Sequence, residues 1–254
     1  MKITFLGTGT STGVPRIGCD CPVCTSNDSR NRRLRASVLL TQNDENILID
    51  CGPDFRQQML RASVKSLTAI VLTHEHYDHV GGLDDVRPFG QVGIYAEKRV
   101  LNAIQHNMPY SFAEKKYKGV PEFSLHEITD KAFSVGDWHF LPINLKHLYL
   151  PVFGYRIGNF AYLTDFNGID EAEFEKLKNL DLLVIDSLRI TQHPSHNSLE
   201  EALAFTAKIK AKKTYLIHID HSMGLHEEVE KILPENVRIA YDGLCLTLDA
   251  SMKK

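Results

Sequence analysis

The chain has 254 residues, 43% of them hydrophobic, which is enough to bury the core of one large α/β domain, and we expect one domain over 1–254. The net charge of −3 argues against a general nucleic-acid surface, so nucleic acid is not an expected partner. No stretch reaches the roughly 18 apolar residues of a membrane span and the first residues lack a signal-peptide core, so we expect a cytoplasmic protein without a membrane partner.

Short apolar runs rich in β-branched residues predict strands. In chain order they cover residues 3–6, 37–41, 47–49, 69–72, 93–95, 140–143, 155–157, 160–163, 182–185, 214–217, 237–240 and 244–248. Helical patterns cover residues 53–62, 98–106, 171–178, 199–209 and 225–233. Ser198 and Glu201 form a capping-box pattern that begins the fourth of these helices. Early hairpins followed by alternating strands and helices predict an α/β fold of two mixed β-sheets flanked by helices.

Two loop patterns resemble phosphate-binding elements without matching them. The segment 7–13 is rich in glycine but lacks the Gly-Lys-Ser/Thr ending of a P-loop, so we expect a tight turn near the active site. The basic run 30–35 is expected to be a solvated loop, with contact to an anionic substrate as the alternative. Cys51 and Cys245 are expected to be small core residues.

Three histidines and an aspartate follow the predicted strand 69–72 as His74, His76, Asp78 and His79. Histidines two positions apart do not share a helix face, so the pattern favours a turn beyond the strand end. Imidazole and carboxylate together suit one or two divalent first-row metals. The alternative is a histidine-rich surface loop, but so dense a cluster after a strand favours a metalloenzyme.

Candidates for further ligands stand where later predicted strands give way to loops. They are His147, Asp165 and His218. Since each follows an apolar run, all three are expected to converge on one sheet edge.

A second cluster contains Cys19, Cys21 and Cys24. Three thiolates satisfy a tetrahedral zinc that needs one further ligand, and His221, three residues past His218, is our candidate. Such a closed site would be structural. A redox or incidental cysteine cluster is the alternative, but a redox Cys-x-x-Cys pair usually opens a helix in a βαβ unit, which is not predicted here.

The His-x-His-x-Asp-His pattern resembles the metallo-β-lactamase superfamily of hydrolases. This resemblance implies an αβ/βα sandwich with metals at one edge between the sheets. It further implies that Asp50 orients the cluster without binding metal. The implied ligands are His74, His76 and His147 for one metal and Asp78, His79 and His218 for the other, with Asp165 as the bridge.

Both clusters together resemble the phosphoribosyl cyclic phosphodiesterases of the carbon-phosphorus lyase pathway. The resemblance implies two manganese or zinc ions in the catalytic site and one structural zinc. It implies a small phosphodiester substrate, most specifically 5-phosphoribosyl 1,2-cyclic phosphate, and a homodimer is expected on this ground only. Asp78 and Asp165 would then support catalysis, and His196 would act as general acid, with nearby His193 the poorer match.

Three alternatives remain open. A tRNA 3′-processing endonuclease of the same superfamily shares most ligands, but it usually has a protruding glycine-rich and basic arm that this chain lacks. The pyrroloquinoline-quinone biosynthesis protein shares the cysteine motif but is degenerate in the histidine motif. A non-catalytic metal-binding scaffold or sensor would be favoured by a missing ligand, and none is missing.

Overall fold

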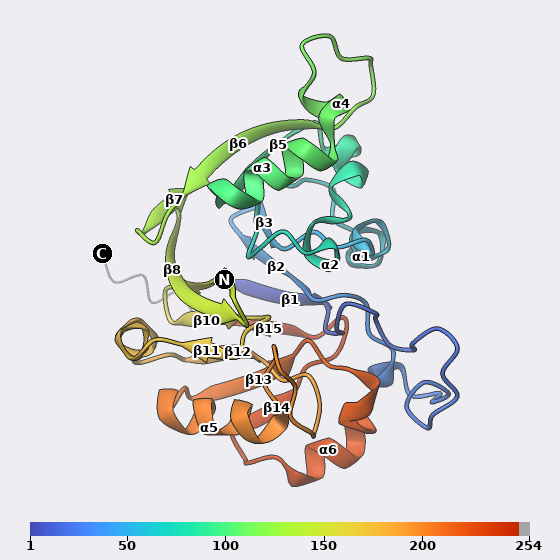
Figure 1. Ribbon diagram of the computed structural model, residues 1–254, viewed down its shortest axis with the longest axis vertical. Helices are drawn as coiled ribbons and strands as arrows, with labels where there is room; N and C mark the ends of the chain where they lie inside the picture. The colour runs from blue at the N-terminus through green and yellow to red at the C-terminus, as the bar shows by residue number, and fades with distance from the viewer. Residues whose placement is uncertain (249–254) are drawn as a thin grey trace.

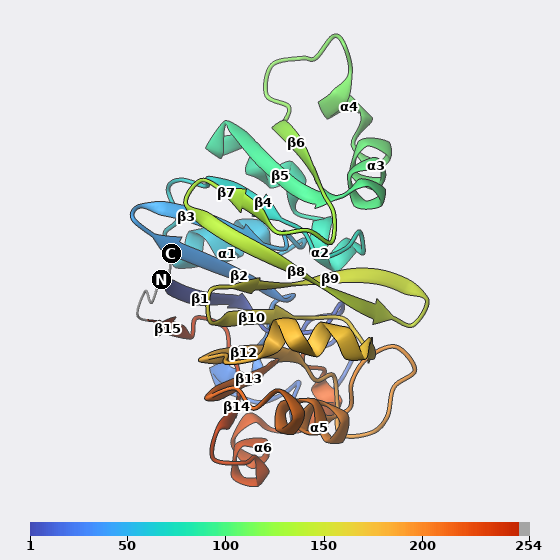
Figure 2. The same ribbon diagram turned by 90° about the vertical axis from the view of Figure 1, so that its left-hand side faces the viewer.

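The computed structural model describes residues 1–248, whose strands form two mixed sheets that pack face to face (Figures 1 and 2). The first sheet contains, in spatial order, β15 (Cys245–Thr247), β1 (Lys2–Gly7), β2 (Ser37–Gln42), β3 (Glu45–Ile49), β4 (Ala69–Val71), β5 (Gln91–Glu97) and β6 (Glu122–Ile128). The second contains β11 (Gly168–Ile169), β8 (Trp138–His147), β9 (Leu150–Ile157), β10 (Phe160–Leu163), β12 (Leu182–Asp186), β13 (Lys213–Ile217) and β14 (Val237–Ile239), with β7 (Phe133–Val135) paired to β8.

Helices cover the outer face of each sheet (Figures 1 and 2). The first sheet is covered by α1 (Phe55–Ala62), the 3₁₀ segment η2 (Leu83–Phe89) and α3 (Lys98–Asn107). The second is covered by η3 (Glu171–Leu177), α5 (Leu199–Ile209) and α6 (His226–Ile232). The remaining short helical elements are η1 (Ser29–Asn31), α2 (Tyr77–Val80), α4 (Pro109–Phe112) and η4 (His221–Met223). The predicted αβ/βα sandwich is confirmed.

The central strands are apolar on both faces because one face packs against the other sheet and the opposite face packs against helices. Every residue of β4, β10 and β12 apart from Asp186 is apolar or aromatic, and all of them are buried. This explains why these strands appear in the sequence as continuous apolar runs. Among the described residues, no helix is long and apolar enough to cross a membrane.

Every strand predicted from the sequence is present, and the capping box of Ser198 and Glu201 is confirmed. The prediction missed β6, whose residues are largely exposed or half-buried, and the very short β7 and β11. The expected helix over 171–178 is a 3₁₀ segment. The turn expected around the histidine motif instead includes one helical turn, α2, which begins after His76.

Two expectations about single residues were wrong. Cys245 is exposed, whereas Cys51 is buried as expected. Arg33, within the basic run expected to be solvated, is only 3% exposed. Its guanidinium donates to the Thr8 hydroxyl at 2.8 Å and to the Ala240 carbonyl, and it lies 3.2 Å from His226 Nδ1. The charge is buried because polar groups from distant parts of the chain surround it.

Tyr155 links the two sheets, since its buried hydroxyl on β9 donates to the Leu72 carbonyl beyond β4 at 2.5 Å. We expect Tyr155→Phe to lower the free energy of unfolding by about 1–3 kcal/mol because the buried carbonyl loses its donor. Urea unfolding followed by circular dichroism measures the change. Tyr215→Phe, at the half-buried margin of the same core, should change it by less than about 0.5 kcal/mol. Equal values for the two variants would contradict the prediction.

Candidate metal centre

The predicted ligands meet where strands of both sheets end in the same direction. Carboxyl ends of parallel strands lie at one edge of a sheet, which is where open α/β sheets place their ligands. Strand β4 is parallel to β3, and β10, β12 and β13 are parallel to one another. The polar residues at or just beyond these ends, together with the end of β8, are Asp50, His74, His147, Asp165, Asp186 and His218.

Three groups of side chains share Asp165, and one of them joins it to Asp186, His196 and His218. The carboxylate of Asp165 and potential ligand atoms of Asp78, His79 and His218 all lie within 4.8 Å of one another. A second group, within the same limit, joins Asp165 to His74 and His76. The His218 Nε2 to Asp165 Oδ1 distance is 2.9 Å. Asp165 therefore lies between two ligand sets, which is the position of a bridging carboxylate.

His147 lies beside the second group. Its ring centroid is 5.2 Å from that of His76 and 6.0 Å from that of His74. Its Nδ1 is 2.8 Å from the Ser195 carbonyl, which leaves Nε2 free for another partner. The structure thus brings together all seven residues predicted as ligands of the two metals.

The charges and unpaired atoms of this cluster fit bound cations. His74 Nε2 and His79 Nε2 are buried without a hydrogen-bond partner. Burial and the neighbouring His79 lower the pKa of His74 well below its ordinary value, which favours the neutral form that binds metals. Burial opposes protonation of His79 too, but Asp165, Asp78 and Asp50 outweigh it and raise its pKa. The surroundings of His79 are therefore rich in negative charge, which a divalent cation would neutralise.

Asp50 lies behind the cluster and fixes the orientation of His79. Its Oδ2 is 2.8 Å from His79 Nδ1, and its Oδ1 accepts from the Thr73 backbone N–H at 2.9 Å. A carboxylate on the far nitrogen of a ligating imidazole sets the tautomer and ring direction. Asp50 therefore holds His79 with Nε2 facing Asp78 and Asp165.

Three residues at this edge have left-handed backbone conformations. Asp50, Asp165 and His218 have φ values of 63°, 51° and 62°. Such conformations cost non-glycine residues about 1–3 kcal/mol each and concentrate at functional sites. The chain turns sharply at each of these strand ends, and the surrounding core maintains the strain.

Asp186 also ends an apolar run, 184–186, which resembles that of the phosphoribosyl cyclic phosphodiesterases, but no role in the site was predicted for it from the sequence. Its Oδ1 lies 3.6 Å from both His196 Nδ1 and His218 Nδ1, and its Oδ2 accepts from the Asn197 N–H at 3.0 Å. The rings of His196 and His218 stack with centroids 4.9 Å apart. One buried carboxylate thus lies beside both imidazoles, with its Oδ1 just beyond hydrogen-bond distance of each Nδ1.

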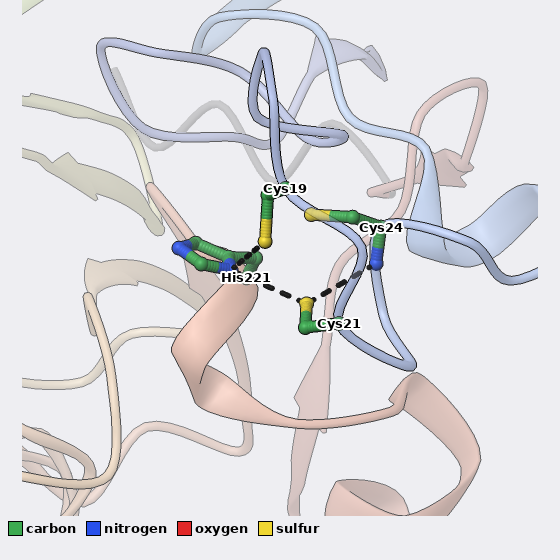
Figure 3. A group of neighbouring side chains, drawn as sticks. All are labelled: Cys19, Cys21, Cys24 and His221. Carbon is green, nitrogen blue, oxygen red and sulfur yellow. Dashed lines mark hydrogen bonds between the residues drawn. The ribbon is translucent and has the colours of Figure 1, made fainter.

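The cysteine cluster forms a separate site (Figure 3). Cys19 Sγ and Cys21 Sγ are 3.4 and 3.3 Å from His221 Nδ1, and Cys24 completes a group whose ligand atoms lie within 4.8 Å of one another. The contact with His221 lowers the pKa of the Cys21 thiol to about 6. Three sulfurs and one imidazole nitrogen match a closed tetrahedral zinc site.

Comparisons with known proteins agree with this geometry. A model described as "Beta-lactamase superfamily domain" matches residues 45–219. The chain therefore belongs to the metallo-β-lactamase superfamily. This membership supports the conclusion that the protein is a hydrolase. The crystal structure of a "New Diphosphatase from the PhnP Family" has 41% sequence identity and a TM-score of 0.91 over 96% of each chain. Within the superfamily, the chain belongs to the PhnP family.

Two more distant structures share the fold. Zn²⁺-bound PqqB from Methylobacterium extorquens is 19% identical with a TM-score of 0.81, covering 98% of this chain and 100% of that one. The short form of human tRNase Z is 21% identical with a TM-score of 0.71, covering 97% and 99%.

A longer curated relative, named octanoyltransferase, comes from Porphyromonas gingivalis. It is 44% identical over 255 residues, which cover 98% of this chain and 52% of that protein. Another, coenzyme PQQ synthesis protein B of Xanthomonas oryzae, is 28% identical over 50% of this chain and 47% of its own length. The chain spans about half the length of these curated relatives.

We propose that the cysteine cluster holds a structural zinc. Cys21→Ser should then lower the zinc content by about one per chain and reduce the Tm, because metal binding contributes to folding free energy. Metal analysis and differential scanning calorimetry measure both. Cys245→Ser, which changes an exposed thiol outside the cluster, should alter neither. A folded Cys21→Ser protein with its full zinc content would exclude this role.

Proposed function

We propose that this protein is a binuclear metal-dependent phosphodiesterase that hydrolyses a small cyclic phosphodiester, with 5-phosphoribosyl 1,2-cyclic phosphate as the expected substrate. The observation that carries the proposal is Asp165, a carboxylate shared by two ligand groups beside His196. Two metals held by such a shared carboxylate would suit an in-line displacement at phosphorus. The similarity to a diphosphatase supports chemistry on phosphate esters.

The metals, as manganese or zinc, would be held by the residues that converge at the sheet edge. His74, His76 and His147 would hold one, and Asp78, His79 and His218 the other, with Asp165 between them. When bound, such a pair lowers the pKa of water and neutralises charge on the phosphoryl oxygens. Asp50 and Asp186 would keep the ligating rings in place.

We assign to His196 the role of protonating the leaving oxygen. Its side chain is 12% exposed, against 1% for His218, so it would be accessible to a bound substrate while its neighbour remains enclosed. Asp186 lies on the Nδ1 side, which leaves Nε2 as the atom that would donate the proton. The Asn197 N–H, held by the same carboxylate, fixes the backbone beside His196.

The test includes two other reactions, because similar proteins are named tRNase Z and octanoyltransferase. Human tRNase Z shares the fold, and the octanoyltransferase relative is a protein about twice as long. A metal-activated water also attacks thioester carbonyls, so an octanoyl thioester is a relevant substrate.

The test compares manganese-loaded protein on bis(p-nitrophenyl) phosphate, 5-phosphoribosyl 1,2-cyclic phosphate, a 3′-extended tRNA and an octanoyl thioester. The highest kcat/KM should belong to the cyclic sugar phosphate, and Asp165→Asn should abolish it because the shared carboxylate loses its charge. Preference for tRNA or the thioester would reassign the substrate. No turnover of any substrate would favour a metal-binding scaffold.

His196→Ala should lower kcat for the cyclic phosphodiester by roughly 10²- to 10⁴-fold, because the leaving oxygen loses its proton donor. The metal content measured in parallel should remain that of the wild type. A smaller loss is expected with bis(p-nitrophenyl) phosphate, since nitrophenolate needs less protonation on leaving. Unchanged turnover of the cyclic substrate would remove His196 from the mechanism.

A further inference from the structure

The loop 187–197 carries His196 and also a positive charge that has no carboxylate partner in the described structure. Arg189 Nε donates to the Thr191 carbonyl at 3.2 Å and its Nη2 to the Gln192 carbonyl at 2.7 Å. A guanidinium has five N–H donors in a rigid fork, so these two bonds leave three for another ligand. The two carbonyls hold the side chain in place without neutralising its charge.

This arginine lies near His193, since burial, the neighbouring His196 and then the positive charge of Arg189 lower the pKa of that imidazole. The ring centroids of His193 and His196 are 5.1 Å apart, and that of His196 is 4.9 Å from His218. The Ser195 N–H donates to His193 Nδ1 at 3.3 Å, so Nε2 of His193 carries the proton and remains a donor. Gln192, whose carbonyl holds Arg189, immediately precedes His193.

Other cations on the segments that bear the ligands are already paired. Arg35, which lies just before β2, forms an ion pair with Asp54 at 3.1 Å. Arg99 pairs with Glu75 of the histidine motif, and Lys146, which precedes His147, pairs with Asp170. Carboxylate partners reduce the attraction of these three side chains for a second anion, whereas no carboxylate in the described structure offsets the charge of Arg189.

We propose that Arg189, with His193 beside it, binds a second, non-reacting anionic group of the substrate: a phosphate monoester such as that at C5 of a phosphorylated ribose. This inference rests on the proposed function and specifies the substrate class of the same site. Guanidinium and phosphate form paired, charge-assisted hydrogen bonds. Because the carbonyls of Thr191 and Gln192 already order the side chain, binding costs little conformational entropy.

The test compares three diesters that differ at one position remote from the reacting bond. They are 5-phosphoribosyl 1,2-cyclic phosphate, ribose 1,2-cyclic phosphate without the 5-phosphate, and bis(p-nitrophenyl) phosphate. Arg189→Met should lower kcat/KM about 10- to 100-fold for the first, the loss expected for one charge-assisted contact, and less than about twofold for the other two. Arg189→Lys, which keeps the charge but not the fork, should recover part of the loss.

Binding provides a second readout that does not require turnover. Calorimetric titration with ribose 5-phosphate should show a Kd raised about 10- to 100-fold by Arg189→Met. Titration with ribose, which lacks the phosphate, should show no such change. Lys146→Met is the matched control, because it removes a nearby cation already paired with Asp170, and it should leave both affinities unchanged.

The outcomes separate this inference from the proposed function. Equal losses on all three diesters would show that Arg189 only braces the loop of His196, and unchanged kinetics and binding would also overturn the subsite. A wild-type enzyme that cleaves none of the three diesters would contradict the proposed function. In that case, loss of ribose 5-phosphate binding in Arg189→Met would still support the subsite.

Discussion

The structure depends on holding four carboxyl groups at one enclosed edge. Asp50, Asp78, Asp165 and Asp186 are all buried, and a buried charge is costly unless an opposite charge or hydrogen bonds compensate it. The surrounding histidines and the Thr73 and Asn197 N–H groups provide part of that compensation. Divalent cations would provide the rest. Removing charge from any of these carboxylates therefore affects the stability of the edge as well as its chemistry.

The cysteine cluster connects the N-terminal segment to this same edge through His221. His221 stands three residues beyond His218, so the group that binds Cys19 and Cys21 is fixed to the end of β13. The glycine-rich turn approaches the same place, where the Ile219 N–H donates to the Thr8 carbonyl at 2.9 Å and the Thr10 N–H donates to the Ile219 carbonyl at 3.1 Å. The segment before β2 is thereby held beside the catalytic edge despite having little regular structure.

The sequence predicted the central strands and the convergence of the seven candidate ligands well because both depend on local patterns. Strands buried on both faces appear as apolar runs, and each ligand follows such a run or belongs to one dense motif. It did not predict β6, because half-exposed residues carry a weak pattern. The burial of Arg33 and the role of Asp186 were not predicted, for another reason. Arg33 is buried by groups about 200 residues away along the chain, and Asp186 acts through contacts with His196 and His218 that no spacing rule encodes.

Burial distinguishes two histidines that are otherwise placed alike. His196 and His218 have stacked rings, and each has Nδ1 at 3.6 Å from the same Asp186 oxygen. His218 is enclosed and lies 2.9 Å from Asp165, so its Nε2 is committed to the ligand cluster. His196 lies on a loop and retains some exposure, so its Nε2 remains available to a substrate. One carboxylate can therefore lie beside both the proposed ligand and the proposed proton donor, because the strand end and the loop place the two rings at different depths.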